Sequence, residues 1–250
     1  MKRAVLITGA ASGTGFSIAE RFAKEGYAVF ITSRNGTDAE KSAEVIRQTY
    51  GVYAKGLQIS SGSMVEVDEA FDEVEKSGYY LSSLVLNAAD LGMNMPVLTT
   101  DIDDWMRVIT TNLGWNFKIT QRAARLMTKA GGSIVFVGSN TANRAIKNRS
   151  AYIASKGGII SLAKALAVEL GEYGIRVNTL VSGSIKTSRF DALSAEQQEE
   201  KKKRVPINDF ADFEDIANAA WFLATDMSKN VTGTTLTVDG GADAQLLPGV

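Results

Sequence analysis

The architecture of this chain is set near its N-terminus, by Ala4-Val5-Leu6-Ile7-Thr8-Gly9-Ala10-Ala11-Ser12-Gly13-Thr14-Gly15. An apolar run of strand length leads into a turn with three glycines, and a helix-period pattern follows near residues 14–25. Such glycines permit a tight turn, let the backbone approach a pyrophosphate and leave the helix N-terminus free to bind it. The spacing is G-x-x-x-G-x-G rather than G-x-G-x-x-G, so a purely structural turn stays open. Its place in the first strand–helix turn favours nucleotide binding.

Short apolar runs alternate with longer helical patterns through the rest of the chain. This alternation indicates βαβ units and a parallel sheet. The run at 133–137 is apolar without alternation, as in strands covered on both faces. We predict an α/β fold: a doubly wound, Rossmann-type, seven-stranded parallel sheet with helices on both faces, in a single domain spanning 1–250. The expected strands are Ala4–Thr8, Ala28–Ser33, Tyr53–Ile59, Ser83–Asn87, Ser133–Gly138, Arg176–Val181 and Thr234–Val238. The expected helices lie near 14–25, 38–50, 64–77, 101–129, 151–172 and 213–225.

The composition narrows the classes of partner. With 27 basic and 28 acidic residues the formal net charge is −1, so no overall field favours nucleic acid or a membrane. Histidine and cysteine are absent, which excludes disulfides and thiolate ligands, and no metal site is predicted. The apolar run after Arg3 is too short for a signal peptide, and no run approaches the roughly 18 apolar residues of a membrane span. We expect a cytoplasmic protein that acts on a small molecule.

Tyr152 and Lys156 are four residues apart on an expected helix, and Ser139 lies 13 residues before the tyrosine. Side chains at i and i+4 share a helix face. Tyrosine is a poor acid–base group at neutral pH because its ordinary pKa is about 10. A neighbouring ammonium favours the phenolate, so we expect Lys156 to lower the pKa of Tyr152. Ser139 is a candidate to hold the oxygen that gains or loses the proton. The alternative is a helix-surface pair without chemistry.

The end of the second expected strand, Ile31-Thr32-Ser33-Arg34-Asn35, addresses the choice of nucleotide. An NAD site carries an acidic residue about 20 residues after the glycine turn, where it binds the ribose hydroxyls. Here Ser33 takes that place and Arg34 follows it. A guanidinium suits a phosphate, and no carboxylate repels one. We predict NADP(H) rather than NAD(H); the alternative is an exposed arginine in a polar turn.

Together these motifs resemble the short-chain dehydrogenase/reductase family, in its branch of about 250 residues and its 3-oxoacyl-ACP reductase-like members. The resemblance covers essentially the whole chain. The matching elements are T-G-x-x-x-G-x-G at Thr8–Gly15, Asn87-Ala88-Ala89, Asn112, Ser139, Y-x-x-x-K at Tyr152–Lys156 and the ending Thr237–Gly241.

The resemblance implies an NADP(H)-dependent oxidoreductase that interconverts a carbonyl and an alcohol by hydride transfer. Tyr152 would exchange a proton with the substrate oxygen, which Ser139 would bind. Lys156 would hold the nicotinamide ribose, and Asn112 would anchor a water that links Lys156 to solvent; for Asn112 a structural role in a helix kink stays open. A homotetramer is also implied. The implied cofactor-binding residues are Thr8, Gly9, Ser12, Gly13, Thr14, Gly15, Ser33, Arg34, Ser60, Asn87, Ala88, Ala89, Tyr152, Lys156, Gly183, Ile185 and Thr187.

Three positions depart from the family pattern, all in the expected cofactor site. Ser60 replaces an acidic or amide residue after the third strand. Ala89 replaces a glycine, and Ser182-Gly183 replaces Pro-Gly. None of these changes removes a catalytic group.

The region 184–210 interrupts the strand–helix rhythm, and its charged stretch runs from Glu196 to Arg204. Two interpretations stay open, a solvated helix face and a mobile lid; we predict a substrate lid at 184–210. The loop after Ser139 carries Arg144 and Lys147 but no acid. These two are candidates to bind an anionic or polyhydroxylated substrate, unless they merely face water.

Two other functions are compatible with the fold. One is a catalytically silent nucleotide-binding sensor or scaffold, which has no need of the complete set of Ser139, Asn112, Tyr152 and Lys156. The other is a sugar-nucleotide epimerase, for which the region after Gly183 is short.

Overall fold

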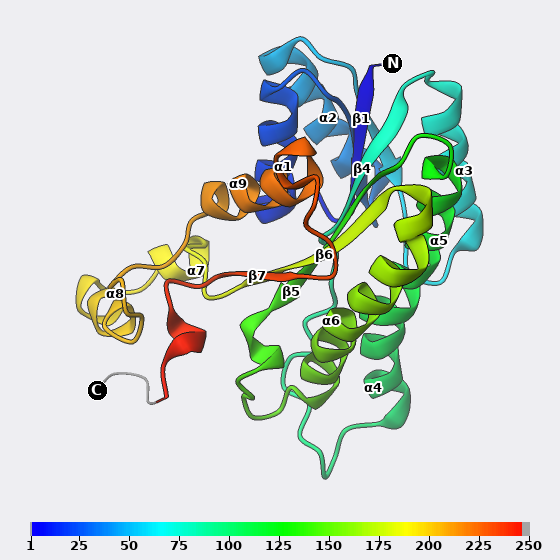
Figure 1. The fold of residues 1–250 in the computed structure, drawn as a ribbon. Helices are drawn as coiled ribbons and strands as arrows, with labels where there is room; N and C mark the ends of the chain where they lie inside the picture. The colour runs from blue at the N-terminus through cyan, green and yellow to red at the C-terminus, as the bar shows by residue number, and fades with distance from the viewer. Residues whose placement is uncertain (1, 247–250) are drawn as a thin grey trace.

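The computed structural model describes residues 2–246, in which seven parallel strands form one sheet with the order β3-β2-β1-β4-β5-β6-β7 (Figure 1). The strand order reverses between β1 and β4, and at such a switch point the carboxyl ends of the strands leave a crevice for ligands. The predicted doubly wound fold is confirmed. The strands are β1 (Arg3–Ile7), β2 (Ala28–Ser33), β3 (Ala54–Gln58), β4 (Tyr80–Leu86), β5 (Gly132–Ser139), β6 (Ile175–Ser182) and β7 (Thr235–Val238).

Helices cover both faces of the sheet, and each face has its own apolar core (Figure 1). One layer consists of α1 (Gly13–Lys24), α2 (Gly36–Tyr50) and α9 (Phe213–Ala224). The other consists of α3 (Met64–Lys76), α5 (Trp115–Met127) and α6 (Ser150–Leu170). Central strands are apolar on both sides for this reason, and Phe136 in β5 is fully buried.

The single helix predicted near 101–129 is wrong in detail. It consists of α4 (Ile102–Ile109), a π-helical turn over Thr110–Gly114, and α5. Asn112, in that turn, accepts a hydrogen bond on its backbone oxygen from Asn116 Nδ2 at 2.7 Å. Single π-helical turns occur mostly at functional sites, because they re-aim one side chain without ending the helix.

One helical stretch among the described residues, Ser150–Tyr173, is long and apolar enough to cross a membrane by length and composition alone. The sequence reasoning missed it because Lys156 and Lys164 interrupt the apolar run. Buried side chains such as Ile159 and Ala163 pack it against the sheet, and the core helix of a folded domain passes the same test.

The two ends of the region 184–210 lie next to each other. Ile185 pairs with Ala211 in an isolated bridge, and Lys186 N donates to Ala211 O at 2.9 Å. Between these points lie two short helices, α7 (Ser188–Asp191) and α8 (Ala195–Lys202), which project beyond the sheet (Figure 1). No residue of α8 is buried.

Candidate active site

The carboxyl ends of β1 and β4 are joined by two polar side chains, Thr8 and Asn87. Thr8 Oγ1 accepts from the backbone nitrogens of Asn87 and Ala88, both at 3.0 Å. Asn87 Nδ2 donates to the backbone oxygens of Thr8 at 3.1 Å and Gly9 at 3.0 Å. Two sets of predicted nucleotide residues, far apart in the sequence, therefore lie together at the switch point. Ala89 follows them and is exposed.

In the glycine turn after β1, neighbouring backbone segments lie too close together for a side chain at some positions. Gly9 and Gly13 have φ of +63° and +57°, in the left-handed region that favours glycine. A Cβ on Gly15 would lie 2.5 Å from Gly9 O and 2.7 Å from Asn87 Nδ2. A Cβ on Gly13 would meet only the Phe213 ring, at 3.8 Å, so that side of the turn is open. Ser12 and Thr14 flank Gly13 at the start of α1, and the Ser12 side chain makes no capping hydrogen bond. The backbone here fits a bound pyrophosphate at a helix N-terminus.

The predicted adenosine-side residues lie on the neighbouring strands β2 and β3. Ser33 ends β2, and its Oγ accepts from Asn35 N at 3.3 Å. Arg34 is exposed, and its side chain has no ion pair or hydrogen bond to the described residues 2–246. Ser60 follows β3, and its backbone N donates to the Glu66 carboxylate at 2.6 Å. This bond is the main reason that the pKa of Glu66 lies below its ordinary value.

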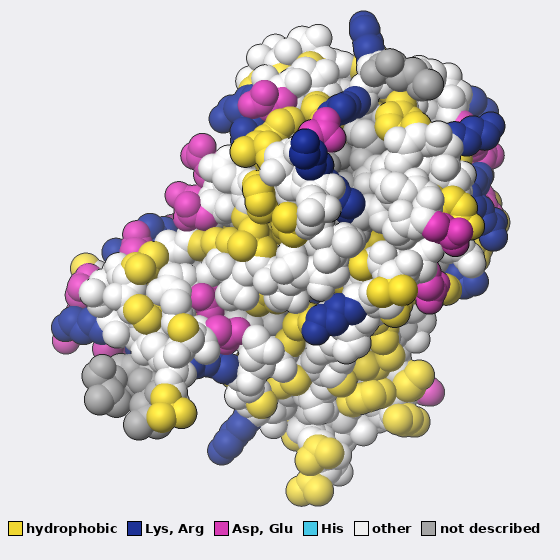
Figure 2. All heavy atoms as spheres, viewed as in Figure 1, with side chains coloured by type: hydrophobic (Ala, Val, Ile, Leu, Met, Phe, Trp, Pro, Cys, Tyr) yellow, Lys and Arg dark blue, Asp and Glu magenta, His cyan; other side chains and the backbone are white. Residues whose placement is uncertain are grey.

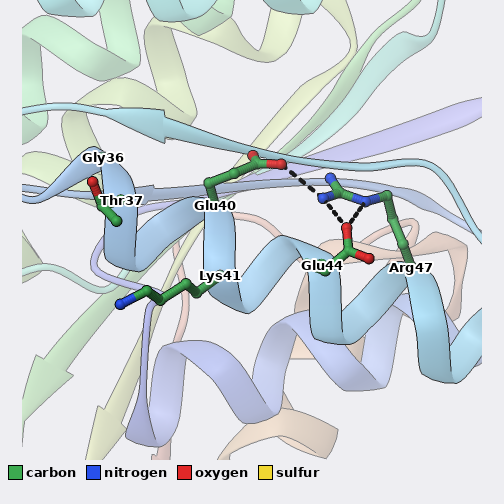
Figure 3. A pocket seen from close by; sticks show the side chains of 6 residues that line it. All are labelled: Gly36, Thr37, Glu40, Lys41, Glu44 and Arg47. Atoms are coloured by element: carbon green, nitrogen blue, oxygen red, sulfur yellow. Dashed lines mark hydrogen bonds and ion pairs between the residues drawn. The ribbon is translucent and has the colours of Figure 1, made fainter.

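The outer side of α2 carries a hollow of about 540 Å³ (Figure 3). Glu40 and Glu44 turn toward Arg47 and pair with it, whereas Lys41 points away from them. The predicted catalytic side chains are not among the residues described as lining it, and its centre is an exposed ion-pair network. We do not assign the reaction to this hollow.

The predicted catalytic residues come together where β5 ends and α6 begins. Ser139 is the last residue of β5, and its Oγ accepts from Thr141 Oγ1 at 2.9 Å. Tyr152 lies in the first turn of α6 and is 8% exposed, and the Ser139 hydroxyl lies near enough to its phenol to lower the pKa of Tyr152. One turn later, Lys156 is 2% exposed, and its Nζ donates to Val137 O at 2.7 Å. Lys156 Nζ lies 5.6 Å from the centre of the Tyr152 ring.

Burial dominates the pKa values of this group. It raises the pKa of Tyr152, while the hydrogen bond with Ser139 and the charge of Arg149 act in the opposite direction. It lowers the pKa of Lys156 to about 8. The expectation that Lys156 brings the pKa of Tyr152 down is therefore wrong in this structure. The cost of burying a phenolate exceeds the local attraction, and the cation that lowers the pKa of Tyr152 is Arg149.

Asn112 joins the β4 end of the crevice to α6. Its Oδ1 accepts from Asp90 N at 2.7 Å, and its Nδ2 donates to Asp90 O at 2.9 Å and to Ser155 Oγ at 3.0 Å. Ser155 Oγ in turn donates to Tyr152 O at 2.7 Å. Both amide protons of Asn112 are thus used within the protein, which matches the structural role that the sequence left open.

Gly183, Ile185 and Thr187 follow β6 at the same edge of the sheet. A Cβ on Gly183 would lie 2.5 Å from the Asp239 Cβ, so glycine lets the two segments touch. Thr187 precedes α7. A hollow of about 460 Å³ opens beside these residues and beneath α7 and α8. Its lining combines apolar and hydroxyl side chains with two cations of the 184–210 region: Ser184, Ile185, Thr187, Phe190, Lys201, Arg204, Val205, Phe210 and Ala242.

The two predicted substrate cations are placed differently from one another. The Arg144 guanidinium donates to Gln245 O, and its Nε lies 3.5 Å from Asp243 Oδ1. Arg144 therefore ties the loop after β5 to the C-terminal segment. Lys147 is exposed. Neither is among the residues that line the hollow beneath α7 and α8.

Sequence reasoning missed Arg149, which stacks on Tyr152 with its guanidinium carbon 4.8 Å from the ring centre. The available signal was spacing: Arg149 precedes Tyr152 by three residues, and i, i+3 side chains meet on a helix. It also missed a small apolar cluster beside the tyrosine, in which Trp105 packs near Met95 and Val108.

Known proteins resemble this chain over nearly its whole length. The family described as enoyl-(acyl carrier protein) reductase matches residues 9–243. A 3-oxoacyl-[acyl-carrier-protein] reductase, FabG, of Aquifex aeolicus is 32% identical over 237 residues, which cover 94% of this chain and 95% of the relative. The FabG of Staphylococcus aureus is 34% identical over 243 residues, covering 96% and 98%. A gluconate 5-dehydrogenase from Burkholderia cenocepacia, solved in complex with NADP and tartrate, has a TM-score of 0.88 and 30% identity, covering 98% of this chain and 96% of that one. The chain belongs to the short-chain dehydrogenase/reductase family of oxidoreductases.

Proposed function

We propose that this chain is an NADP(H)-dependent oxidoreductase that interconverts a ketone or aldehyde and the corresponding alcohol. The observation that carries the proposal is the meeting, at one edge of the sheet, of the glycine turn after β1 with Ser139, Tyr152 and Lys156. A nucleotide crevice and a buried acid–base tyrosine are the two parts that such a reaction needs.

In this proposal the hydroxyls of Tyr152 and Ser139 handle the proton and bind the substrate oxygen. Because Tyr152 has a raised pKa, it is protonated at neutral pH and donates its proton to the carbonyl oxygen in the reductive direction. In the reverse direction it takes the proton from the alcohol. Ser139 Oγ accepts from both the backbone N and the Oγ1 of Thr141, which leaves its own proton for the Tyr152 oxygen and, once a substrate is bound, for the substrate oxygen.

NADP(H), when bound, would supply or accept the hydride. The backbone of the glycine turn with Ser12 and Thr14 would hold its pyrophosphate, and Asn87, Ala88 and Ala89 would border the crevice. Lys156 would hold the nicotinamide ribose once its Nζ turns from Val137 O. The other residues of the proposed cofactor site are Thr8, Ser60, Gly183, Ile185 and Thr187.

Arg34 supports NADP(H) over NAD(H). It is exposed at the end of β2, and no acidic residue stands at Ser33 to repel a phosphate. The relative from Burkholderia cenocepacia was solved with NADP. A higher kcat/KM with NADH than with NADPH would overturn this part of the proposal.

The hollow beneath α7 and α8 favours an anionic substrate. Lys201 and Arg204 line it, and although Arg204 pairs with Glu200 at 2.7 Å, no carboxylate is among the residues described as lining it. We propose that the region 184–210 is the substrate lid and that these cations take the place expected for Arg144 and Lys147. A hydroxy acid of gluconate's kind fits this lining better than a neutral ketone. Acids should have lower KM values than their amides, and Lys201→Gln should abolish the difference.

The proposal is tested by following NADPH and NADH absorbance against a panel of 3-oxoacyl thioesters, keto acids and simple ketones. Turnover that Tyr152→Phe abolishes, with cofactor binding retained, supports the assigned acid–base role. Binding of a nucleotide without turnover across the panel would favour the catalytically silent sensor instead.

We further propose a cytoplasmic homotetramer. Figure 2 shows apolar side chains gathered over the part of this face where α4 and α6 lie. Large apolar side chains are exposed there and on α5, among them Ile102 (66%), Met106 (44%), Phe117 (39%) and Val168 (84%). Contiguous exposed apolar surface of this kind commonly marks a protein interface. Light scattering that gives a monomer at micromolar concentration would contradict the assembly.

A further inference from the structure

Arg149 occupies an unusual place for a cation, directly on the face of the tyrosine. It precedes α6, and its guanidinium carbon lies 4.8 Å from the centre of the Tyr152 ring. A cation over an aromatic face is attracted by the ring electrons, and more strongly when water is excluded. Tyr152 is 8% exposed and Arg149 is half-buried, so this contact is partly shielded from water.

The guanidinium has no acidic partner among residues 2–246. Within this part of the chain no ion pair involves it, and its Nε is buried without a hydrogen bond. Its terminal nitrogen contacts the thioether of Met93 at 2.6 Å. Arg149 is half-buried, so its charge is only partly withdrawn from water, and its Nε edge carries the cost of burial without a carboxylate. The contact that offsets this cost is the Tyr152 ring.

The backbone holds Arg149 in this position. Asn148 has a φ of +61°, and its carbonyl accepts from Met95 N at 2.9 Å. Arg149 itself forms a bridge with Met95, and its carbonyl accepts from Ile153 N at 2.9 Å. The residue is therefore clamped between the β4–α4 connection and the first turn of α6.

We propose that Arg149 is a positioning residue for the reaction: it fixes the Tyr152 ring and stabilises the tyrosinate form through the face of that ring. The inference rests on the proposed acid–base role of Tyr152 and names a residue that sets its protonation.

The surrounding charges favour Arg149 for this task. The charged groups on the α6 side are Arg149 and Lys156, and β5 contributes only the hydroxyl of Ser139. On the β4–α4 side, Asp90 and Arg107 pair with each other. Lys156 donates to Val137 O, and burial lowers its pKa to about 8. Above that pH the lysine loses its charge, whereas a guanidinium keeps it.

The test is a spectroscopic titration that needs neither substrate nor cofactor. Tyrosinate absorbance is recorded after stopped-flow pH jumps, before alkaline unfolding, and the titration of the Tyr152→Phe variant is subtracted to isolate Tyr152. The same pair is measured with Arg149→Gln and with Arg149→Met, both of which remove the guanidinium charge. We expect the pKa of Tyr152 to rise by about 1 pH unit in each, because neither replacement carries a charge.

A Tyr152 midpoint that is unchanged in either Arg149→Gln or Arg149→Met would overturn the inference, since the guanidinium charge would then not matter. Arg125→Gln, an exposed arginine in the last turn of α5, is the matched control and should leave the midpoint unchanged. Turnover in the wild type with an unchanged midpoint would sink this inference alone. A raised midpoint without turnover on any substrate would sink the proposed function and leave standing only that Arg149 sets the protonation of Tyr152.

Discussion

Burial of Lys156 makes a prediction about stability that can be worked out from the site. Its pKa falls from 10.5 to about 8 on folding. At 1.36 kcal/mol per unit, burying the charged form costs the folded state about 3 kcal/mol below pH 8. Because the folded pKa lies below the unfolded one, the unfolded chain binds more protons between about pH 8 and 10.5. The contribution of Lys156 to stability therefore rises with pH in that window.

Lys156→Met removes the titration and keeps a side chain of similar length. Relative to this variant, the wild type should gain about 2 kcal/mol in free energy of unfolding between about pH 7.5 and 10. Urea unfolding followed by circular dichroism over this range measures the difference. The lost hydrogen bond to Val137 O adds a cost that does not vary with pH, so only the slope tests the reasoning.

Lys164→Met is the matched control, because Lys164 is exposed on the same helix. Its difference from the wild type should stay flat over the same pH range. The reasoning is refuted if the Lys156→Met difference is equally flat, or if the wild type loses stability relative to that variant as the pH rises.

Three further predictions concern the fold and the nucleotide end. Gly15→Ala places a Cβ 2.5 Å from Gly9 O, so it should lower the free energy of unfolding by about 1–3 kcal/mol and weaken NADPH binding, both measurable by calorimetry. Arg34→Ala should reduce the preference for NADPH over NADH about tenfold, the equivalent of about 1.4 kcal/mol, in fluorescence titrations with each cofactor. Phe136→Ala, in the middle of the sheet, should cost about 3–5 kcal/mol in denaturant unfolding. As its control, Val45→Ala, at a 47% exposed position on α2, should cost less than about 1 kcal/mol.

The elements that local pattern determines were predictable from the sequence. Strand β2 (Ala28–Ser33) lies within its predicted bounds because an apolar run buried on both faces has a definite beginning and end. Strand β4 starts at Tyr80, three residues before its expected start at Ser83. Tyr80 and Leu81 pair with Arg3 and Ala4, and this pairing depends on a neighbour 77 residues away in the chain.

The features that tertiary contacts determine were not predictable. The π-helical turn at Asn112 exists where that side chain holds Asp90 and Ser155, two partners from other segments. The pKa of Tyr152 is raised because the side chain is buried, and the spacing of residues in the sequence does not reveal burial. The Arg144 guanidinium is the kind of group that binds an anionic substrate, but in this structure it donates a hydrogen bond to Gln245 O in the C-terminal segment.

The bridge between Ile185 and Ala211 has a consequence for how such a protein can diversify. Because the intervening segment leaves and returns at adjacent points, its length and sequence can change while β6 and α9 keep their register. Each doubling of a loop's length costs only about 0.6 kcal/mol in closure entropy. The residues of this segment that line the hollow can therefore be replaced together during evolution. A change of substrate range then need not disturb the acid–base residues.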